Sequence, residues 1–415
     1  MKRAIQNKNK GWIALLLLFA MLLSFTSACS SQQDAIAPLV TVTPDLPSTD
    51  VSTHTERPEL TFAPTPSPTA SPLVDPIMDI IQGLSDRELI GQMVMCGFTG
   101  SREPSKEFVE LMETYKLGNV ILFSANIHSD KQTEALTASL KLHNPMPGIP
   151  LIIATDVEGG TVRRFSSWQP NIKSAYSLGQ KGDAQFTYDQ FARIAGRLIA
   201  TGINMDLAPV MDIAPKISGT ALDTRMFGTV PEEAAIQIEA AISGLHDGGV
   251  ASVGKHFPGH GNTTTDSHSS LPVMQATKEM WDEYERIPFL RGMEAGVDGI
   301  MMGHLLYKNI DPDYPASISK IFITDILREE LGFQGVVFSD DMVMGGITSR
   351  LEIKEAAVKF IEAGGDIVLI GRKTDQQRAA LEGIYDAFIS GQISRERLEQ
   401  SVYRILTLKE KRIGL

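Results

Sequence analysis

The sequence predicts one (β/α)8 barrel of the TIM type, preceded by an export signal and an extended tether. Three observations carry the barrel prediction: eight short apolar segments at intervals, amphipathic segments between them, and polar residues at the C-terminal ends of the apolar segments. Nearly continuous apolar runs are typical of parallel strands covered on both faces, as in a closed barrel. An open doubly wound sheet has the same alternation and remains the alternative, because strand order cannot be read from one sequence.

The first 28 residues are predicted to be a signal peptide of the lipoprotein type. Four basic residues precede an apolar run from Trp12 to Leu23, which is shorter than the about 20 apolar residues that span a bilayer. Two small residues stand directly before Cys29, an arrangement similar to the lipobox in which the cysteine is lipidated and becomes the new N-terminus. Thr26 stands where the lipobox usually has leucine, and a simple cleaved signal peptide is the alternative. The prediction is an exported protein whose Cys29 anchors it to the outer side of the cell membrane.

Residues 29–75 are predicted to form the lipidated cysteine and a Pro/Ser/Thr-rich tether. Eight of the 22 prolines lie between Ser30 and Asp75. Such a composition contains too little apolar surface to form a core and behaves as an extended spacer. The catalytic domain is therefore predicted at residues 76–415, as one domain.

Charge and cysteine content exclude several classes of function. The formal net charge is −12, and residues 1–28 carry four positive charges and no acids, so the remainder stands near −16 (−12 minus 4). A chain this acidic repels nucleic acid. Only Cys29 and Cys96 are present, so lipidation of Cys29 leaves no internal disulfide. We expect a monomer that needs no cofactor and binds no nucleic acid.

The predicted strands and helices alternate from residue 76 onward. The strands are expected at residues 93–98, 119–124, 151–156, 203–208, 250–255, 299–304, 335–340 and 366–371. Helical spacing is seen between them, for example in SDKQTEALTASLKLH, EEAAIQIEAAISGLHDGG and IKEAAVKFIEAGG. The last two segments end in Gly-Gly, a common helix stop.

Polar residues follow four of the predicted strands at their C-terminal ends. These residues are Asp156, Lys255, His304, and Asp340 with Asp341. In a barrel the loops at these ends converge on one mouth, where catalysis takes place. The sequence therefore predicts a site that binds a polar molecule.

The stretch KHFPGHGNTTTDSH, from Lys255 to His268, allows three interpretations. A metal site would use His256 and His260, but Pro258 and the neighbouring glycines disfavour the helix that gives this spacing its meaning, and no cysteine is near. A phosphate-binding loop would place its lysine after the glycines, whereas Lys255 precedes them. The sequence therefore predicts no metal and favours acid–base chemistry.

The acid–base interpretation rests on Asp266 and His268. A carboxylate that binds one imidazole nitrogen fixes the tautomer and raises the basicity of the other nitrogen, so the histidine can deliver a proton near neutral pH. A group that attacks or stabilises from the opposite face is also needed, and Asp340 at a strand end suits that role.

These segments together resemble a known family. KHFPGHG…DSH, ATDVEGGTVRRF, GVVFSDDM, GINMDLAPVMDI, DTRMFG, HLLYKNIDPDYPASIS and AGGDIVLIG are similar, in content and order, to the single-domain bacterial β-N-acetylhexosaminidases of glycoside hydrolase family 3. The resemblance covers about residues 76–415. It implies a retaining exo-β-N-acetylglucosaminidase that removes terminal N-acetylglucosamine from glycans such as peptidoglycan fragments.

The resemblance also implies roles for individual residues. Asp340 would be the nucleophile, and His268, oriented by Asp266, would be the general acid and then the base. The terminal sugar would be bound by a set of charged and polar side chains: Asp156, Arg164, Arg225, Lys255 and His256. Val343 departs from the small residue that the family usually has beside the nucleophile.

Three other functions remain open at this stage. A β-glucosidase or β-xylosidase of the same fold would cleave acetamido sugars weakly and would not need His268. A non-catalytic sugar-binding lipoprotein would bind without hydrolysis, although the intact Asp340 and Asp266–His268 argue against it. Phosphate in place of water is a further possible acceptor, because a histidine that acts as base is neutral and repels phosphate less than a carboxylate does.

Several other residues have structural interpretations from sequence alone. Asp341 is expected to be structural and not catalytic, and Glu158 to brace a loop. Trp168 is expected to pack in the core, with stacking on a second sugar as the alternative. His260 and His304 could either line the pocket or serve as internal braces.

Overall fold

Eight parallel strands close into a barrel in the part of the chain that the computed structural model describes, residues 75–168 and 170–415. The strands are β1 (Val94–Gly97), β2 (Asn119–Ile121), β3 (Ile152–Thr155), β4 (Met205–Asp206), β5 (Ala251–Phe257), β7 (Gly299–Met302), β9 (Val336–Ser339) and β10 (Val368–Ile370). They follow one another around the barrel in chain order, and β10 pairs with β1. A parallel bridge between Phe338 and Ile367 joins β9 to β10. The barrel prediction is thus confirmed. Seven of the barrel strands lie within their predicted ranges, and β5 extends two residues beyond the predicted end at residue 255.

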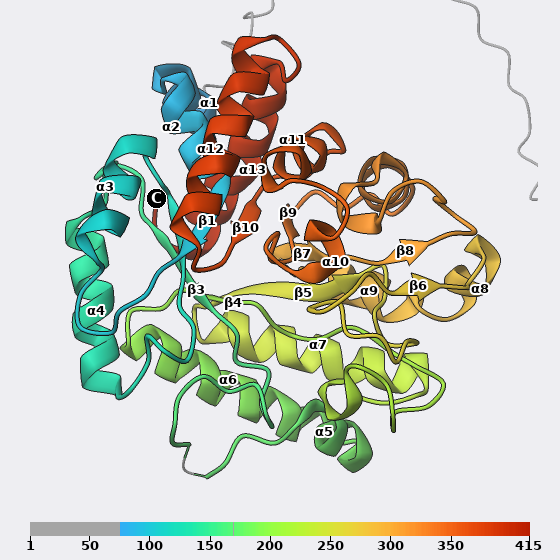
Figure 1. Ribbon diagram of the computed structural model, residues 1–415. Helices are drawn as coiled ribbons and strands as arrows, with labels where there is room; N and C mark the ends of the chain where they lie inside the picture. Colours follow the sequence, from blue (N-terminus) through green and yellow to red (C-terminus); the bar gives the residue numbers. More distant parts are fainter. Residues whose placement is uncertain (1–74, 169) are drawn as a thin grey trace, which may run out of the picture. The chain divides into compact units, whose positions relative to one another are not determined.

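Helices surround the strands and cover their outer side (Figure 1). They are α1 (Pro76–Gly83), α2 (Asp86–Gln92), α3 (Lys106–Tyr115), α4 (Asp130–Leu142), α5 (Ala175–Lys181), α6 (Ala184–Ala200), α7 (Pro231–Asp247), α8 (Lys278–Glu283), α9 (Arg286–Glu294), α10 (Gly345–Thr348), α11 (Ile353–Glu362), α12 (Thr374–Ile389) and α13 (Arg395–Arg412). Local sequence sets several boundaries: Ser85 and Ser129 begin α2 and α4 with capping boxes, and α7 ends before Gly248.

Some elements are additions to the simple alternation. Strands β6 (Val273–Met274) and β8 (Leu306–Tyr307) pair in parallel as a small separate sheet. The segment between β7 and β9 carries a π-helix, η3 (Ile321–Glu330), and two short 3₁₀ turns, η1 (Asp223–Arg225) and η2 (Ala316–Ile318), complete the structure. Neither β6 nor β8 is among the strands that the sequence predicts.

Two buried aspartates attach the last helix, α13, to the N-terminal end of the barrel. Asp298 stands directly before β7 and binds Arg412 at 2.9 Å and Lys411 at 3.2 Å. Asp366 precedes β10 and binds Arg404 of α13 at 3.1 Å. Since the strands run away from this end, these charges stabilise the closed barrel and leave the opposite end to the loops that form the site.

The predicted signal peptide, Cys29 and nearly all of the predicted tether lie outside the described residues. Those interpretations remain predictions, as does the domain boundary at residue 76. Among the helices of residues 75–415, none has the length and apolar character needed to cross a membrane.

Candidate active site

A cavity of about 280 Å³ opens at the C-terminal ends of the strands, and every predicted site residue of the domain lines it. The structure therefore brings together residues from strand β5 and from the loops after β3, β4, β5 and β9: Asp156, Arg164, Arg225, Lys255, His256, Asp266, His268 and Asp340. Barrel topology explains the convergence, because all parallel strands end at the same mouth. The geometry shows their proximity, and their individual roles remain predictions.

Five charged side chains form a continuous alternating chain along one wall. Arg164 and Lys255 both bind the Asp156 carboxylate, at 2.6 Å and 2.7 Å. Lys255 also binds Glu158 at 2.8 Å, and Arg225 grips Glu158 with two hydrogen bonds of 2.7 Å and 2.9 Å. Bidentate guanidinium–carboxylate pairs fix orientation as well as charge. The wall is thus rigid and presents both donors and acceptors to a polyhydroxylated ligand.

The charges on this wall are mutually stabilised. Burial opposes ionisation of Glu158, but Lys255 and Arg225 outweigh it and lower the pKa of that carboxyl to about 2. In Asp156 the same competition between burial and its two cations also ends with a lowered pKa. Burial alone would lower the pKa of Lys255, yet the two carboxylates raise it. All three groups are therefore charged at neutral pH.

The Lys255 ammonium retains one N–H for a ligand. It has three donors, of which Asp156 and Glu158 take two. Arg164 also has a buried Nε without a hydrogen-bond partner among the described residues. These donors suit hydroxyl or carbonyl oxygens of a sugar.

A buried carboxylate orients His256. Asp212 is inaccessible to solvent on its side chain, and its Oδ2 lies 2.7 Å from the Nδ1 of His256. Burial opposes ionisation of Asp212, but His256 and His260 lower its pKa on balance. An ionised Asp212 holds the proton on Nδ1, so the Nε2 of His256 is the atom free for a ligand.

Asp340 stands directly after β9 and is ionised. Its backbone N–H donates to the carbonyl of Met302 and so continues the ladder with β7, while one of its carboxylate oxygens accepts from the N–H of Asp341. Burial raises the pKa of Asp340, but the neighbouring His256 and His304 together with that hydrogen bond lower it below its usual value. A rigid, ionised carboxylate in a small cavity is suited to act as a nucleophile.

Asp266 and His268 form a hydrogen-bonded pair on the rim. The carboxylate accepts from the backbone N–H of His268 at 2.9 Å and lies 2.8 Å from its Nδ1. The two side chains are 60% and 70% exposed. Burial raises the pKa of Asp266, but its hydrogen bonds to His268 lower that pKa by more. The Asp266 carboxyl is therefore ionised more readily than usual and can hold the Nδ1 proton of His268. Nε2 of His268 is then the ring nitrogen left free to exchange a proton with a ligand.

The structural interpretations of the neighbouring residues are settled by their contacts. Asp341 accepts from the N–H groups of Val343 and Gly371, and burial raises its pKa to about 6. The His304 ring is fully buried between Ser317 and the Asp341 carbonyl, so it is an internal brace. Trp168 is 4% exposed, packs edge-on against Phe165 and has the Arg197 guanidinium over its ring, so it packs in the core as expected.

Sequence reasoning missed two residues of this site. The sequence predicts only a loop brace at Glu158, yet this residue lines the cavity and pairs with two of the predicted sugar-binding cations. Asp212 was not singled out, although it lies in the quoted segment GINMDLAPVMDI as an acid in an apolar run. An acid in such surroundings is buried with a partner, and this signal could have identified it.

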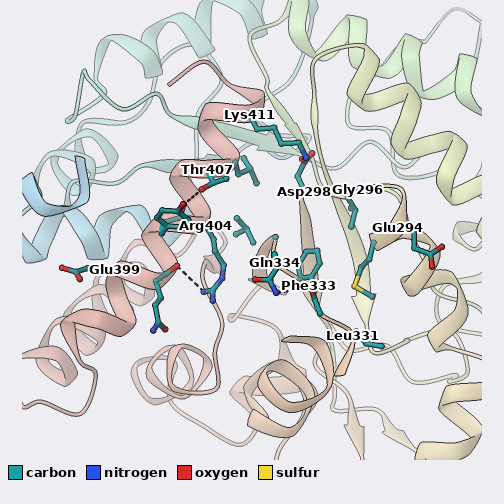
Figure 2. Close-up of a pocket in the computed structure, with 18 of the residues that line it drawn as sticks. Glu294, Gly296, Asp298, Leu331, Phe333, Gln334, Glu399, Arg404, Thr407 and Lys411 are labelled. Carbon is teal, nitrogen blue, oxygen red and sulfur yellow. Dashed lines mark hydrogen bonds and ion pairs between the residues drawn. The ribbon is translucent and has the colours of Figure 1, made fainter. Parts of the chain in front are cut away.

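A second, larger cavity of about 850 Å³ lies at the opposite end of the barrel (Figure 2). Its walls come from α13, with Arg404, Thr407 and Lys411, and from the segments before β7 and β9. Two of its cations are bound within the protein, Lys411 to Asp298 and Arg404 to Asp366, and none of the predicted site residues lines this cavity. The chemistry therefore belongs to the smaller cavity. Within residues 75–415, leaving out residue 169, no three or more His, Cys, Asp and Glu side chains are grouped so that they could hold a metal ion.

Comparison with known protein families gives one clear match. Residues 86–408 match the glycosyl hydrolase family 3 N-terminal domain. A β-hexosaminidase of Alkalilimnicola ehrlichii is 35% identical over 305 residues, which cover 72% of this chain and 85% of that protein. A β-hexosaminidase of Thioalkalivibrio sulfidiphilus is 37% identical over 279 residues, or 65% of this chain and 78% of that protein.

Solved structures agree with the fold. A family 3 β-N-acetylglucosaminidase from Paenibacillus sp. FPU-7 superimposes with a TM-score of 0.77 at 36% identity, covering 80% of this chain and 63% of the Paenibacillus chain. A β-N-acetylhexosaminidase from Beutenbergia cavernae superimposes with a TM-score of 0.71 at 28% identity. The superposition covers 79% of this chain and 99% of the Beutenbergia chain.

Proposed function

The chain belongs to glycosyl hydrolase family 3 and is a β-hexosaminidase, and on this premise we propose that it removes terminal β-linked N-acetylglucosamine with retention of configuration. The substrates would be glycans such as fragments of peptidoglycan. One observation supports the mechanism above all: the ionised Asp340 and the Asp266–His268 pair line the same small cavity.

In the first step, the Asp340 carboxylate attacks the anomeric carbon. The glycosidic C–O bond breaks, and His268 gives the Nε2 proton of its imidazolium to the leaving oxygen. The products are a covalent glycosyl ester on Asp340 and the free aglycone alcohol. The ionised Asp266 stabilises the imidazolium before transfer and holds the Nδ1 proton after it.

In the second step, the neutral His268 accepts a proton from water as the water oxygen attacks the same carbon. The ester bond to Asp340 breaks, which regenerates the carboxylate and the imidazolium. Two displacements on one carbon restore the original configuration. The charged wall of Asp156, Lys255 and Arg164 would bind the hydroxyl and acetamido oxygens of the sugar throughout.

The experiment compares wild-type protein with Asp340→Asn and His268→Ala on an aryl β-N-acetylglucosaminide and the matching aryl β-glucoside. Preferential cleavage of the acetamido substrate, with kcat lost in both variants, is expected. A preference for the glucoside, or full activity of His268→Ala, would contradict the proposal. Binding of N-acetylglucosamine by the wild type without turnover of either substrate would indicate a sugar-binding protein. Product analysis in phosphate buffer separates water from phosphate, because phosphate as acceptor yields the sugar 1-phosphate.

We also propose that Cys29 is acylated and holds the enzyme at the outer side of the cell membrane. The support is the basic and apolar start of the sequence and its lipobox-like residues. Metabolic labelling with a fatty acid is expected to mark the wild type and not Cys29→Ser. Equal labelling, or none in either, would contradict acylation.

A further inference from the structure

The main chain of Asp341, the residue after the proposed nucleophile, is bound on both sides. Its N–H donates to the Oδ1 atom of Asp340 at 2.8 Å. Its carbonyl accepts from the N–H of Met344 at 2.9 Å and lies 3.1 Å from the Nε2 of His304. One of these bonds therefore acts directly on the carboxylate that is proposed to attack the sugar.

The side chain of Asp341 joins the turn after β9 to the end of the neighbouring strand. Its Oδ1 atom accepts from the N–H of Val343 at 3.2 Å and from the N–H of Gly371 at 2.8 Å. Gly371 directly follows β10. Hydrogen bonds to an ionised acceptor are about twice as strong as those between neutral groups, so the charge of this carboxylate strengthens both contacts.

The carboxylate occupies the space that a side chain at position 371 would need. A Cβ on Gly371 would lie 2.4 Å from the Oδ2 atom of Asp341. The φ of Gly371 is not positive, so space and not backbone conformation requires glycine there. Asp341 also lines the cavity, next to Asp340. The contact between the two strand ends is thus close and lies at the proposed reaction site.

Four titratable groups surround the Asp341 side chain and main chain. Burial raises the pKa of Asp341 to about 6, and the adjacent Asp340 acts in the same direction, whereas its two hydrogen bonds and His268 lower it. Cys96 on β1 is neutral, because burial and Asp341 both raise its pKa. Burial lowers the pKa of His304, which meets the Asp341 carbonyl. Asp341 is therefore charged at neutral pH and loses its charge below about pH 6.

We propose that the Asp341 carboxylate is a positioning residue for the nucleophile, because it holds the turn after β9 in the form that keeps the Asp341 N–H on the Asp340 carboxylate. This inference rests on the proposed function. The hydrogen bond fixes the direction in which the other oxygen of Asp340 points, and a nucleophile must be close to the carbon that it attacks and aligned with it. A misplacement of about 1 Å can cost about 100-fold in rate.

The test uses the full-length protein with Asp341→Asn and Asp341→Ala. Asn keeps an oxygen that accepts from the two N–H groups but carries no charge, so it weakens both bonds, whereas Ala removes them. Asp311→Asn is the matched control. Asp311 is also buried, and its Oδ1 also accepts from two backbone N–H groups, those of Asp313 and Tyr314, but it does not line the cavity.

On an aryl β-N-acetylglucosaminide at pH 7, kcat/KM is expected to fall about 3- to 10-fold in Asp341→Asn and about 10- to 100-fold in Asp341→Ala. The loss should lie in kcat, with KM changed less than about threefold, because the sugar-binding wall is unaltered. At pH 5 the ratio of wild type to Asp341→Asn should narrow to less than about two, since protonation removes the same charge from the wild type. Asp311→Asn should match the wild type at both pH values.

Amide hydrogen exchange of residues 340–345 gives a second measurement that needs no turnover. At pH 7 these amides should exchange faster in Asp341→Ala than in the wild type, because the turn opens more often without the carboxylate. Asp311→Asn should leave their exchange unchanged.

Three results would each overturn the proposal: a ratio of wild type to Asp341→Asn that stays constant between pH 7 and pH 5, a similar loss of activity in Asp311→Asn, or unchanged exchange in Asp341→Ala. If Asp341→Ala fails to fold, Asp341→Asn decides the matter in both measurements, because it has nearly the same shape as the wild-type residue. If the wild type cleaves no substrate, the proposed function has failed, and the exchange data still decide whether this carboxylate holds the turn.

Discussion

The Nδ1 atom of His256 lies 2.7 Å from the Oδ2 atom of Asp212, and the backbone N–H of the same histidine donates to that oxygen at 3.0 Å. One buried carboxylate thus fixes both the ring and the main chain of a residue that lines the cavity. Hydrogen bonds to charged groups are worth about 1.5–3 kcal/mol, so this contact is strong enough to set the tautomer.

Replacing Asp212 by Asn is therefore expected to lower kcat/KM about 10- to 100-fold. The amide has no charge to hold the Nδ1 proton, so the Nε2 atom of His256 no longer presents a constant face to the sugar. Steady-state kinetics on the aryl β-N-acetylglucosaminide, per folded molecule, measures the effect.

Asp298→Asn is the matched control, since it alters another buried aspartate that binds a histidine, His246, at the far end of the barrel. Both variants should lose stability in urea unfolding. Only Asp212→Asn should lose activity per folded molecule. A similar loss in the control would mean that the effect is transmitted through the fold and not through His256.

The sequence allowed the fold and the gathering of the site to be predicted because both follow from local patterns. Apolar runs locate the strands, and barrel topology brings together whatever polar residues follow them, such as Asp156, Lys255 and Asp340. No knowledge of distances is needed for that step.

The pairing within the site could not be predicted, because it depends on side-chain distances across the barrel. Glu158 lies 67 positions from Arg225 in the chain and binds it with both oxygens. The contact of Ser267 and His268 with Gly345 and Gly346 is made by backbone atoms. Residue types give no sign of such a contact, apart from the two glycines themselves. Sequence patterns show which residues are buried and which end of a strand they lie at. Which side chains bind one another depends on distances in the closed barrel.

Glu158 is expected to make stability depend on acidic pH. Its folded-state pKa is about 2, against 4.5 as the ordinary value, so the folded state binds fewer protons. The stabilisation is therefore fully present above pH 4.5 and is lost as the pH falls from 4.5 towards 2. In Glu158→Gln the free energy of unfolding at pH 7 should fall by about 3–5 kcal/mol, because Lys255 and Arg225 lose a buried partner.

Urea unfolding of wild type and Glu158→Gln at several pH values between 7 and 3 provides the measurement. The difference between the two proteins should narrow as the pH falls, since protonation removes the same charge from the wild type. A difference that stays constant down to pH 3 would show that folding does not shift the pKa of Glu158.

Lys409 is expected to make the stability of the protein depend on alkaline pH. Its ammonium is fully buried in α13, where it donates to Gln92 and to the Gly118 carbonyl and pairs with no carboxylate of residues 75–168 or 170–415. Burial lowers its pKa to about 7 from 10.5, so between these values the unfolded state binds more protons and stability rises with pH. The slope from this one group approaches about 1.4 kcal/mol per pH unit.

Lys409→Met removes this slope. Urea unfolding at pH 7, 8 and 9 should show wild type gaining stability relative to the variant at each step. Parallel pH curves for the two proteins would mean that the lysine remains protonated in the folded state.

The close packing of α5 against the segment that carries Arg225 predicts opposite effects for two helical glycines. A Cβ on Gly179 would lie 1.6 Å from the carbonyl oxygen of Phe227, two residues after Arg225, so the chain there must move. Gly179→Ala is expected to cost about 1–3 kcal/mol of stability and to raise KM, because Arg225 shifts with its segment.

Gly196 is exposed in α6, and a Cβ added there would have no atom within 4 Å. Gly196→Ala should therefore stabilise the protein by about 0.5–1 kcal/mol and leave KM unchanged. Urea unfolding with steady-state kinetics tests the pair, and a gain of stability in Gly179→Ala would contradict the packing on which the position of Arg225 depends.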